Sequence, residues 1–245
     1  MIKFFRKIRY DLMEKNKTGK YFKYALGEII LVVIGILIAL QINNWNENRK
    51  LDEKRQDYYN QLIDDLKKDK ALLIDNISKT DSIKSSYSVY LETFNQKGLT
   101  IDEMINNLFK LKLSASLINF NSSTFESLEK SGEIKIIPKE LRNKILDLNR
   151  KQKLLEERIK GNAEIQVDFL KEYFVAIGSK DLTNRLIKHP EIEDYFKNEI
   201  NRPKAILALE SNMSWKIATE KSKDFKEILL DIDNTMDLIS IELNK

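Results

Sequence analysis

The chain has 245 residues, of which 33% are Lys, Arg, Asp or Glu and only seven are Gly and three Pro, a composition typical of long charged helices rather than of a loop-rich enzyme. It contains no cysteine, which excludes disulfides, thiolate metal sites and a cysteine nucleophile. Its net charge is +4, but residues 1–23 alone carry +6, so the remainder is slightly acidic and no nucleic-acid-binding domain is predicted.

The first fifteen residues predict an amphipathic helix. Apolar side chains recur there at helical spacing, while Lys3, Arg6 and Lys7 fall on the opposite side. Such a helix suits the lipid headgroup region of a membrane, where its cations lie near anionic lipid. The alternative is that its apolar residues pack against the rest of the protein. Residues 16–19 then predict a break within this basic juxtamembrane segment, residues 1–23.

An unbroken apolar run from Ile29 to Leu40 predicts one transmembrane helix, residues 24–42. The run alone is too short to span a bilayer, but with its flanks it reaches nineteen residues, or about 30 Å of helix. Aromatic residues occur on both sides, with Trp45 at the far interface. We therefore expect the lipid bilayer to be the first partner of this chain.

A cleaved signal peptide is the alternative interpretation of the N-terminus. Its charged leader would be unusually long, and no small-x-small cleavage site follows the apolar run. The +6 charge of residues 1–23, against a nearly balanced stretch after the run, predicts a cytoplasmic N-terminus by the positive-inside rule. In a bacterium with two membranes, residues 43–245 would then form a periplasmic ectodomain.

Several stretches resemble one known family. EKNKTGKY at residues 14–21, YALGE at residues 24–28 and the following IILVVIGILIALQINNWNE are similar to the opening of an uncharacterised family of membrane-anchored bacterial proteins. The match covers residues 1–50, and LEKSG at residues 128–132 is similar to a second, weaker signature. The resemblance implies one N-terminal transmembrane helix and a mostly helical domain beyond it. It implies no activity and no catalytic or ligand residue. In a bacterium with two membranes, the orientation predicted above places this helix in the inner membrane.

Beyond the membrane segment, apolar residues at steps of mostly three, four or seven predict that the helix continues through residues 46–95, which contain no Gly or Pro. Gly98 is expected to end it. Thr100 and Glu103 predict a capping box that opens a short helix.

Residues 121–124 predict the start of another helix, closed by Gly132 in a left-handed conformation. Residues 133–137 are expected to form a small strand or an extended link. Further helices are expected at residues 139–177, 192–200 and 204–245. Since three of the expected helices are long and each has one apolar stripe, the predicted fold class is all-α, an antiparallel bundle.

No catalytic or metal site is predicted. His189 is the only histidine, which excludes a histidine-based metal cluster, and it is expected in an exposed turn. The glycines are scattered, so there is no phosphate-binding loop. The runs of Lys, Asp and Glu are interpreted as solvated helix faces. We therefore expect no cofactor and no enzyme activity.

The candidate site residues lie in the membrane segment. Glu28 is ionisable, which makes it a functional candidate, although it can also be an interfacial residue that pairs with Lys20 or Lys23. Gly35 and Ala39 form a small-xxx-small pair that would let two helices approach closely.

Two functions are compatible with this pattern. The first is a non-enzymatic interaction or scaffold protein that holds a partner, or its own copies, at the membrane. The second is a sensory or ligand-binding periplasmic bundle that signals through a separate partner. A buried polar pocket between the helices would favour the second. For either function we expect a homo-oligomer or a membrane or periplasmic protein partner, and no nucleic acid.

Overall fold

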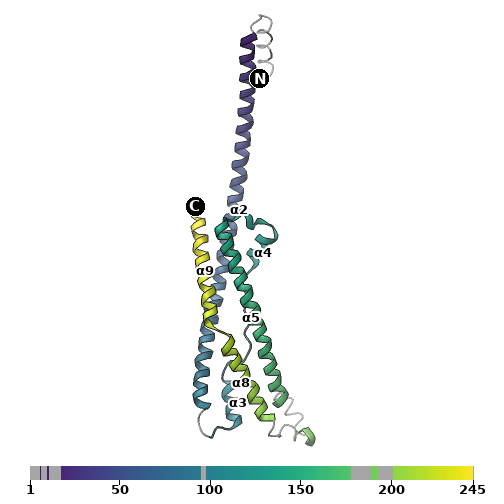
Figure 1. Cartoon of the computed structure of the whole chain (residues 1–245), viewed down its shortest axis with the longest axis vertical. Coiled ribbons are helices and arrows are strands. Elements are labelled where there is room, and N and C mark those ends of the chain that lie inside the picture. The colour runs from purple at the N-terminus through teal and green to yellow at the C-terminus, as the bar shows by residue number, and fades with distance from the viewer. Residues whose placement is uncertain are drawn as a thin grey trace. The chain divides into compact units, whose positions relative to one another are not determined.

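The computed structural model describes residues 6, 10, 18–94, 98–177, 189–192 and 201–244. Every regular element in these ranges is helical and none is a strand, so the expected all-α class is confirmed (Figure 1). The longest element is α2 (Thr18–Phe94), a helix of 77 residues. The predicted continuation of the apolar N-terminal helix into residues 46–95 is therefore also confirmed, up to Phe94.

The chain divides into two compact units, residues 1–57 and residues 58–245. The first unit contains the N-terminal half of α2, where the described side chains are almost all exposed. The second unit contains the rest of α2 and all the other helices. Every buried apolar residue that the structure describes belongs to this second unit.

The second unit holds the other elements with described bounds, and two of its local predictions are confirmed. Thr100 Oγ1 accepts a hydrogen bond from the backbone N–H of Glu103 at 3.3 Å, and the Glu103 carboxylate accepts one from the N–H of Thr100 at 2.8 Å. Gly132 has a φ of +72°, the left-handed conformation expected there. The elements are α3 (Ile101–Phe109), α4 (Ser123–Lys130), the 3₁₀ helix η1 (Glu133–Ile136), α5 (Lys139–Ile177), α8 (Asn201–Thr219) and α9 (Ser222–Leu243).

Two expected elements are wrong. Residues 133–136 form the 3₁₀ helix η1 instead of a strand, because the chain turns tightly after Gly132 and the N–H of Ile137 bonds locally to the carbonyl of Ile134. The expected helix over residues 204–245 is two helices, because Lys221 is extended between α8 and α9. The predicted amphipathic helix near the N-terminus and most of the predicted helix at residues 192–200 lie outside the described residues.

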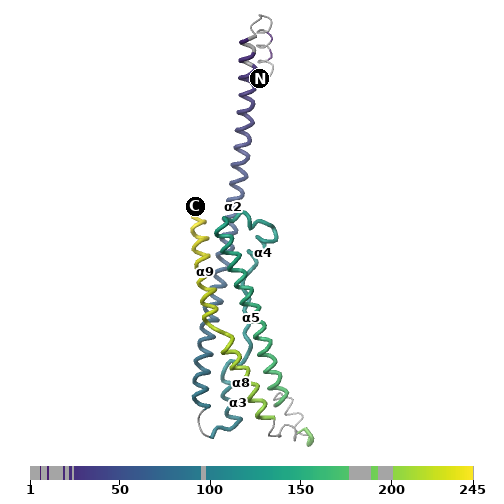
Figure 2. Tube along the Cα trace, viewed as in Figure 1, coloured from purple at the N-terminus to yellow at the C-terminus, as the bar shows by residue number. Residues whose placement is uncertain are grey.

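Ion pairs show the directions of the helices in the second unit. Lys144 near the start of α5 pairs with Asp231 of α9. Arg158, farther along α5, pairs with Asp224, nearer the start of α9, so these two helices are antiparallel. In contrast, α2 and α5 run in the same direction, because residues 110–122 carry the chain back between α3 and α4 (Figure 2). Consecutive long helices therefore do not alternate in direction as in a simple antiparallel bundle.

The core of the second unit consists of two apolar clusters. One joins α2, α4, α5 and α9, and its completely buried members are Tyr59, Leu73, Leu128, Ile232 and Ile239. The other joins the end of α2 with α3, α5 and α8, and its completely buried members are Leu108, Ala205, Leu209 and Met213. Burial of these stripes is the main driving force for folding of the unit.

Candidate functional site

The apolar part of α2 is not a core helix. Within the described residues, α2 is the one helix long and apolar enough to cross a bilayer, and its most apolar window has no buried residue. The large apolar side chains from Ile29 to Leu40 are 47–65% exposed. A stretch of this size has to be covered by lipid or by another protein, since exposed apolar patches of several hundred Å² are rare on soluble monomers.

The predicted site residues in this stretch share one side of α2. Ala39 lies one turn after Gly35, and Glu28 lies seven residues before it. A Cβ atom added to Gly35 would meet nothing within 4 Å, so the helix surface there is flat and open. Glu28 is partly exposed. These three residues therefore offer a narrow face on which a second helix could pack.

The predicted interface residues are described only in part. Trp45 is 66% exposed, and Arg6 is exposed. Lys3 and Lys7 lie outside the described residues.

The second unit contains two buried carboxylates that the sequence analysis interpreted as solvated. Asp69 of α2 is completely buried and accepts three hydrogen bonds: from the backbone N–H and the side-chain amide of Asn121, at 2.8 and 2.7 Å, and from the amide of Gln152 at 2.9 Å. Burial raises the pKa of Asp69, because desolvation outweighs these hydrogen bonds. This network connects residues 110–122, the returning segment between α3 and α4, to both α2 and α5.

Asp65, one turn earlier on α2, binds the N-terminus of α4. Its Oδ2 accepts hydrogen bonds from the hydroxyl of Thr124 at 2.7 Å and from the backbone N–H of Thr124 at 3.3 Å. Ser122 at the N-cap makes no side-chain cap of its own, so Asp65 supplies that acceptor from another helix. Its negative charge also stabilises the positive end of the helix dipole.

A buried ion pair lies where α8 ends. The ammonium of Lys216 donates to the carbonyl of Ser114 at 2.9 Å, to the hydroxyl of Ser116 at 3.0 Å and to Glu220 at 3.1 Å. The side chains of Lys216 and Glu220 are only 2% and 7% exposed. Gln166 of α5 donates to Glu220 at 3.2 Å. The pair therefore joins α8, α5 and the returning segment around the break before α9.

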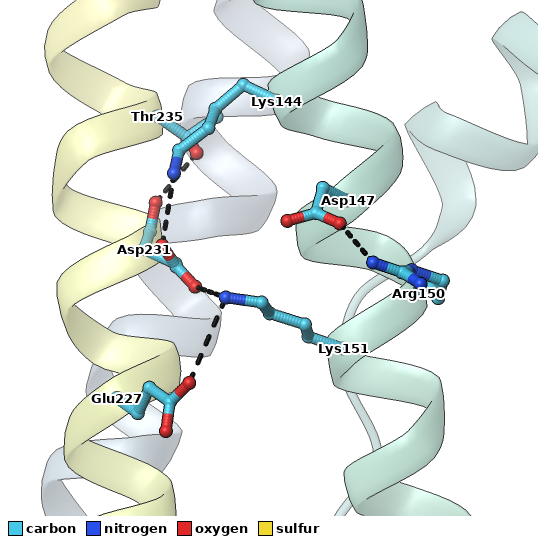
Figure 3. Close-up of polar contacts among 7 residues, drawn as sticks. All are labelled: Lys144, Asp147, Arg150, Lys151, Glu227, Asp231 and Thr235. Atoms are coloured by element: carbon cyan, nitrogen blue, oxygen red, sulfur yellow. Dashed lines mark hydrogen bonds and ion pairs between the residues drawn. The ribbon is translucent and has the colours of Figure 1, made fainter.

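A fourth polar contact joins α5 to α9 (Figure 3). Asp231 lies between Lys144, at 3.1 Å, and Lys151, at 2.6 Å, and Lys151 also approaches Glu227 at 3.9 Å. Partial burial alone would raise the pKa of Asp231, but the hydrogen bonds and charges of the two lysines lower it. These residues connect α5 to α9, so we interpret the contact as one that stabilises the fold.

The described residues contain no group of three or more His, Cys, Asp or Glu side chains placed to hold a metal ion. His189 is exposed, as expected. Asp65, Asn121, Gln152 and Thr235 are among the residues that line a small cavity of about 30 Å³, which is room for one water molecule.

A family model describes this chain over most of its length. The model of a family of unknown function, DUF6090, matches residues 28–201. The chain belongs to this family. The function of DUF6090 is unknown, so the match adds no functional residue to the contacts described above. No curated protein and no solved structure matches the chain.

Spacing could have revealed the buried charges. Asp69 lies seven residues after Leu62 and four before Leu73, on the buried stripe of α2. Lys216 lies seven residues after Leu209 on the stripe of α8. A charged residue on an apolar stripe is the signal that was missed, because all runs of charged residues were interpreted together as solvated helix faces.

Proposed function

We propose that this protein is a non-enzymatic helical scaffold, anchored in the bacterial inner membrane, that holds a partner there, most simply a second copy of itself. The observation that carries the proposal is the apolar stretch of α2. It is exposed along its whole length, and the same helix continues beyond it into the folded, charged second unit. The small residues Gly35 and Ala39 support self-association, since membrane helices pack closely through such residues.

The proposed topology has one span, with the N-terminus in the cytoplasm and residues 43–245 in the periplasm. The +6 charge of residues 1–23 supports this orientation. The proposed ectodomain is a helical bundle in which α9 is antiparallel to α5. The buried polar contacts favour a scaffold, because most of their groups bind one another and leave room for no more than one water molecule.

The second candidate is a sensory or ligand-binding bundle. A groove of about 510 Å³ between α5 and α8 supports it, since this volume lies within the range of small-molecule sites. Lys171, Lys204 and Leu207 are among its lining residues. The groove is open to solvent, and its lining residues lie far along the chain from Gly35 and Ala39. A sensory function would therefore need a separate way to pass the signal from the groove to a partner.

Self-association is tested by replacing Gly35 with isoleucine in the full-length chain. The branched side chain would fill the open face and keep two helices apart, so a membrane two-hybrid signal is expected to fall about tenfold, a loss of ~1.4 kcal/mol of association free energy. Ile36→Leu, at the neighbouring position, is the matched control and should keep the signal. Equal signals from both variants would mean that the membrane helix is an anchor only.

A further inference from the structure

The part of α2 directly after the membrane segment is charged but not packed. Residues 46–57 contain four Lys or Arg and four Asp or Glu, so their net charge is zero, and nearly all their side chains are exposed. Leu51 is the one large apolar residue among them, and it is 47% exposed. A helix that is polar on all sides needs ion pairs or a partner to stay helical.

One face of this charged stretch continues the face of Gly35 and Ala39. From Ala39 the steps to Ile42, Asn46, Arg49 and Glu53 are three, four, three and four residues, which is the spacing of a helix–helix seam. Because α2 is a single helix without interruption, these residues stay aligned from the membrane segment outward.

The contacts of Arg49 on this face are long. Its guanidinium donates to Asn46 Oδ1 at 3.4 Å and lies 3.7 Å from Glu53 Oε1, and both side chains of the ion pair are more than half exposed. A parallel second helix would present the same asparagine and the same glutamate to each Arg49. Asn46, Arg49 and Glu53 would each lie opposite their own copies, and each Arg49 would lie about one turn from the Glu53 of the second copy. At the position of Asn46, asparagine fixes register in paired helices.

We propose that the self-association surface extends beyond the membrane along Ile42, Asn46, Arg49 and Glu53, and that its occupant is the same face of a second copy in parallel orientation. The proposal rests on the proposed function, since both copies must enter one membrane in the same direction. One observation favours a second copy over a strongly charged partner: the stretch has no net charge, so two copies of it do not repel each other as whole segments. The exposed ion pairs set register and orientation more than affinity.

The chain has no cysteine, so single cysteines can be introduced and oxidised in membranes without a background. Disulfide-linked dimers are expected with cysteine at position 39, 42, 46, 49 or 53. Little is expected at position 44, 48, 51 or 55, which lie on the opposite side of the helix at about 100° per residue. Crosslinking at 39 with equal, low yields at all positions from 44 to 55 would overturn the extended surface and leave the membrane dimer standing. No crosslinking at any position, 39 included, would overturn both.

Charge exchange tests the ion pairs in the same assay, with Ile42→Cys as the readout. Arg49→Glu and Glu53→Arg each place like charges together along the seam, so each is expected to lower the dimer yield about fivefold. The double variant Arg49→Glu with Glu53→Arg restores the opposite charges and should restore the yield. A double variant no better than the single ones would overturn the role of this pair.

Discussion

Lys216→Met is expected to lower the free energy of unfolding of the second unit by about 3–5 kcal/mol, the usual cost of breaking a buried ion pair. Methionine keeps the length of the side chain but cannot donate, so Glu220 stays buried with Gln166 as its described donor. The carbonyl of Ser114 and the hydroxyl of Ser116 also lose their donor. Such a loss is a large fraction of the ~5–15 kcal/mol that stabilises a typical protein.

The measurement is urea unfolding of the full-length chain in mild detergent, followed by tryptophan fluorescence. Trp45→Phe in every variant leaves Trp215, next to Lys216, as the single reporter. The double variant Lys216→Met with Glu220→Gln should recover most of the stability, because no buried charge remains unpaired. Lys79→Met is the matched control, since Lys79 pairs with Asp75 on the surface and should cost less than ~0.5 kcal/mol. A Lys216→Met variant as stable as this control would contradict the buried pair.

Asp69→Ala is expected to lower the free energy of unfolding by about 3 kcal/mol, because it removes the acceptor of one buried and two partly buried N–H donors. The returning segment would lose its attachment to α2, so the loss should appear in the same unfolding measurement. Asp64→Ala is the control, since Asp64 lies five residues before Asp69 on α2, is exposed and pairs with Lys67 at 3.6 Å. Equal stabilities of the two variants would contradict the network.

The raised pKa of Asp69 also predicts the sign of a pH effect. The native state binds the proton more readily than the unfolded state, in which the pKa is near 3.8. The contribution of Asp69 to stability therefore falls as the pH rises from 3.8 through the raised native pKa, and it increases again on acidification. Asp69→Asn cannot titrate at this position. The free energy of unfolding of the wild type, measured relative to that of this variant, should therefore increase as the pH falls. The opposite slope would mean that Asp69 is stabilised as an anion.

Much of the fold follows from short-range patterns in the sequence. The continuity of α2 follows from the absence of Gly and Pro between residues 46 and 95, and the start of α3 follows from the Thr100–Glu103 pair. The break between α8 and α9 could not be predicted in this way, because neither Gly nor Pro marks it. It accompanies a tertiary contact, the burial of Lys216 against Glu220 and the returning segment, which apolar spacing does not encode.

The candidate membrane site stays a prediction from the sequence. Gly35 and Ala39 are recognised by type and spacing alone, since membrane helices pack through small residues. The charged network of Asp65 and Asp69 was not predicted, because its partners Asn121, Thr124 and Gln152 lie far along the chain. Long-range polar pairing depends on the tertiary fold, and a single sequence does not specify it.

In the proposed topology, α2 anchors the second unit on the outer side of a membrane. A pair of reporters fused after Lys245 tests this arrangement most directly, one active only in the periplasm and the other only in the cytoplasm. The proposed topology predicts activity of the periplasmic reporter alone, because the +6 segment before the span stays in the cytoplasm. Activity of the cytoplasmic reporter alone would contradict this topology.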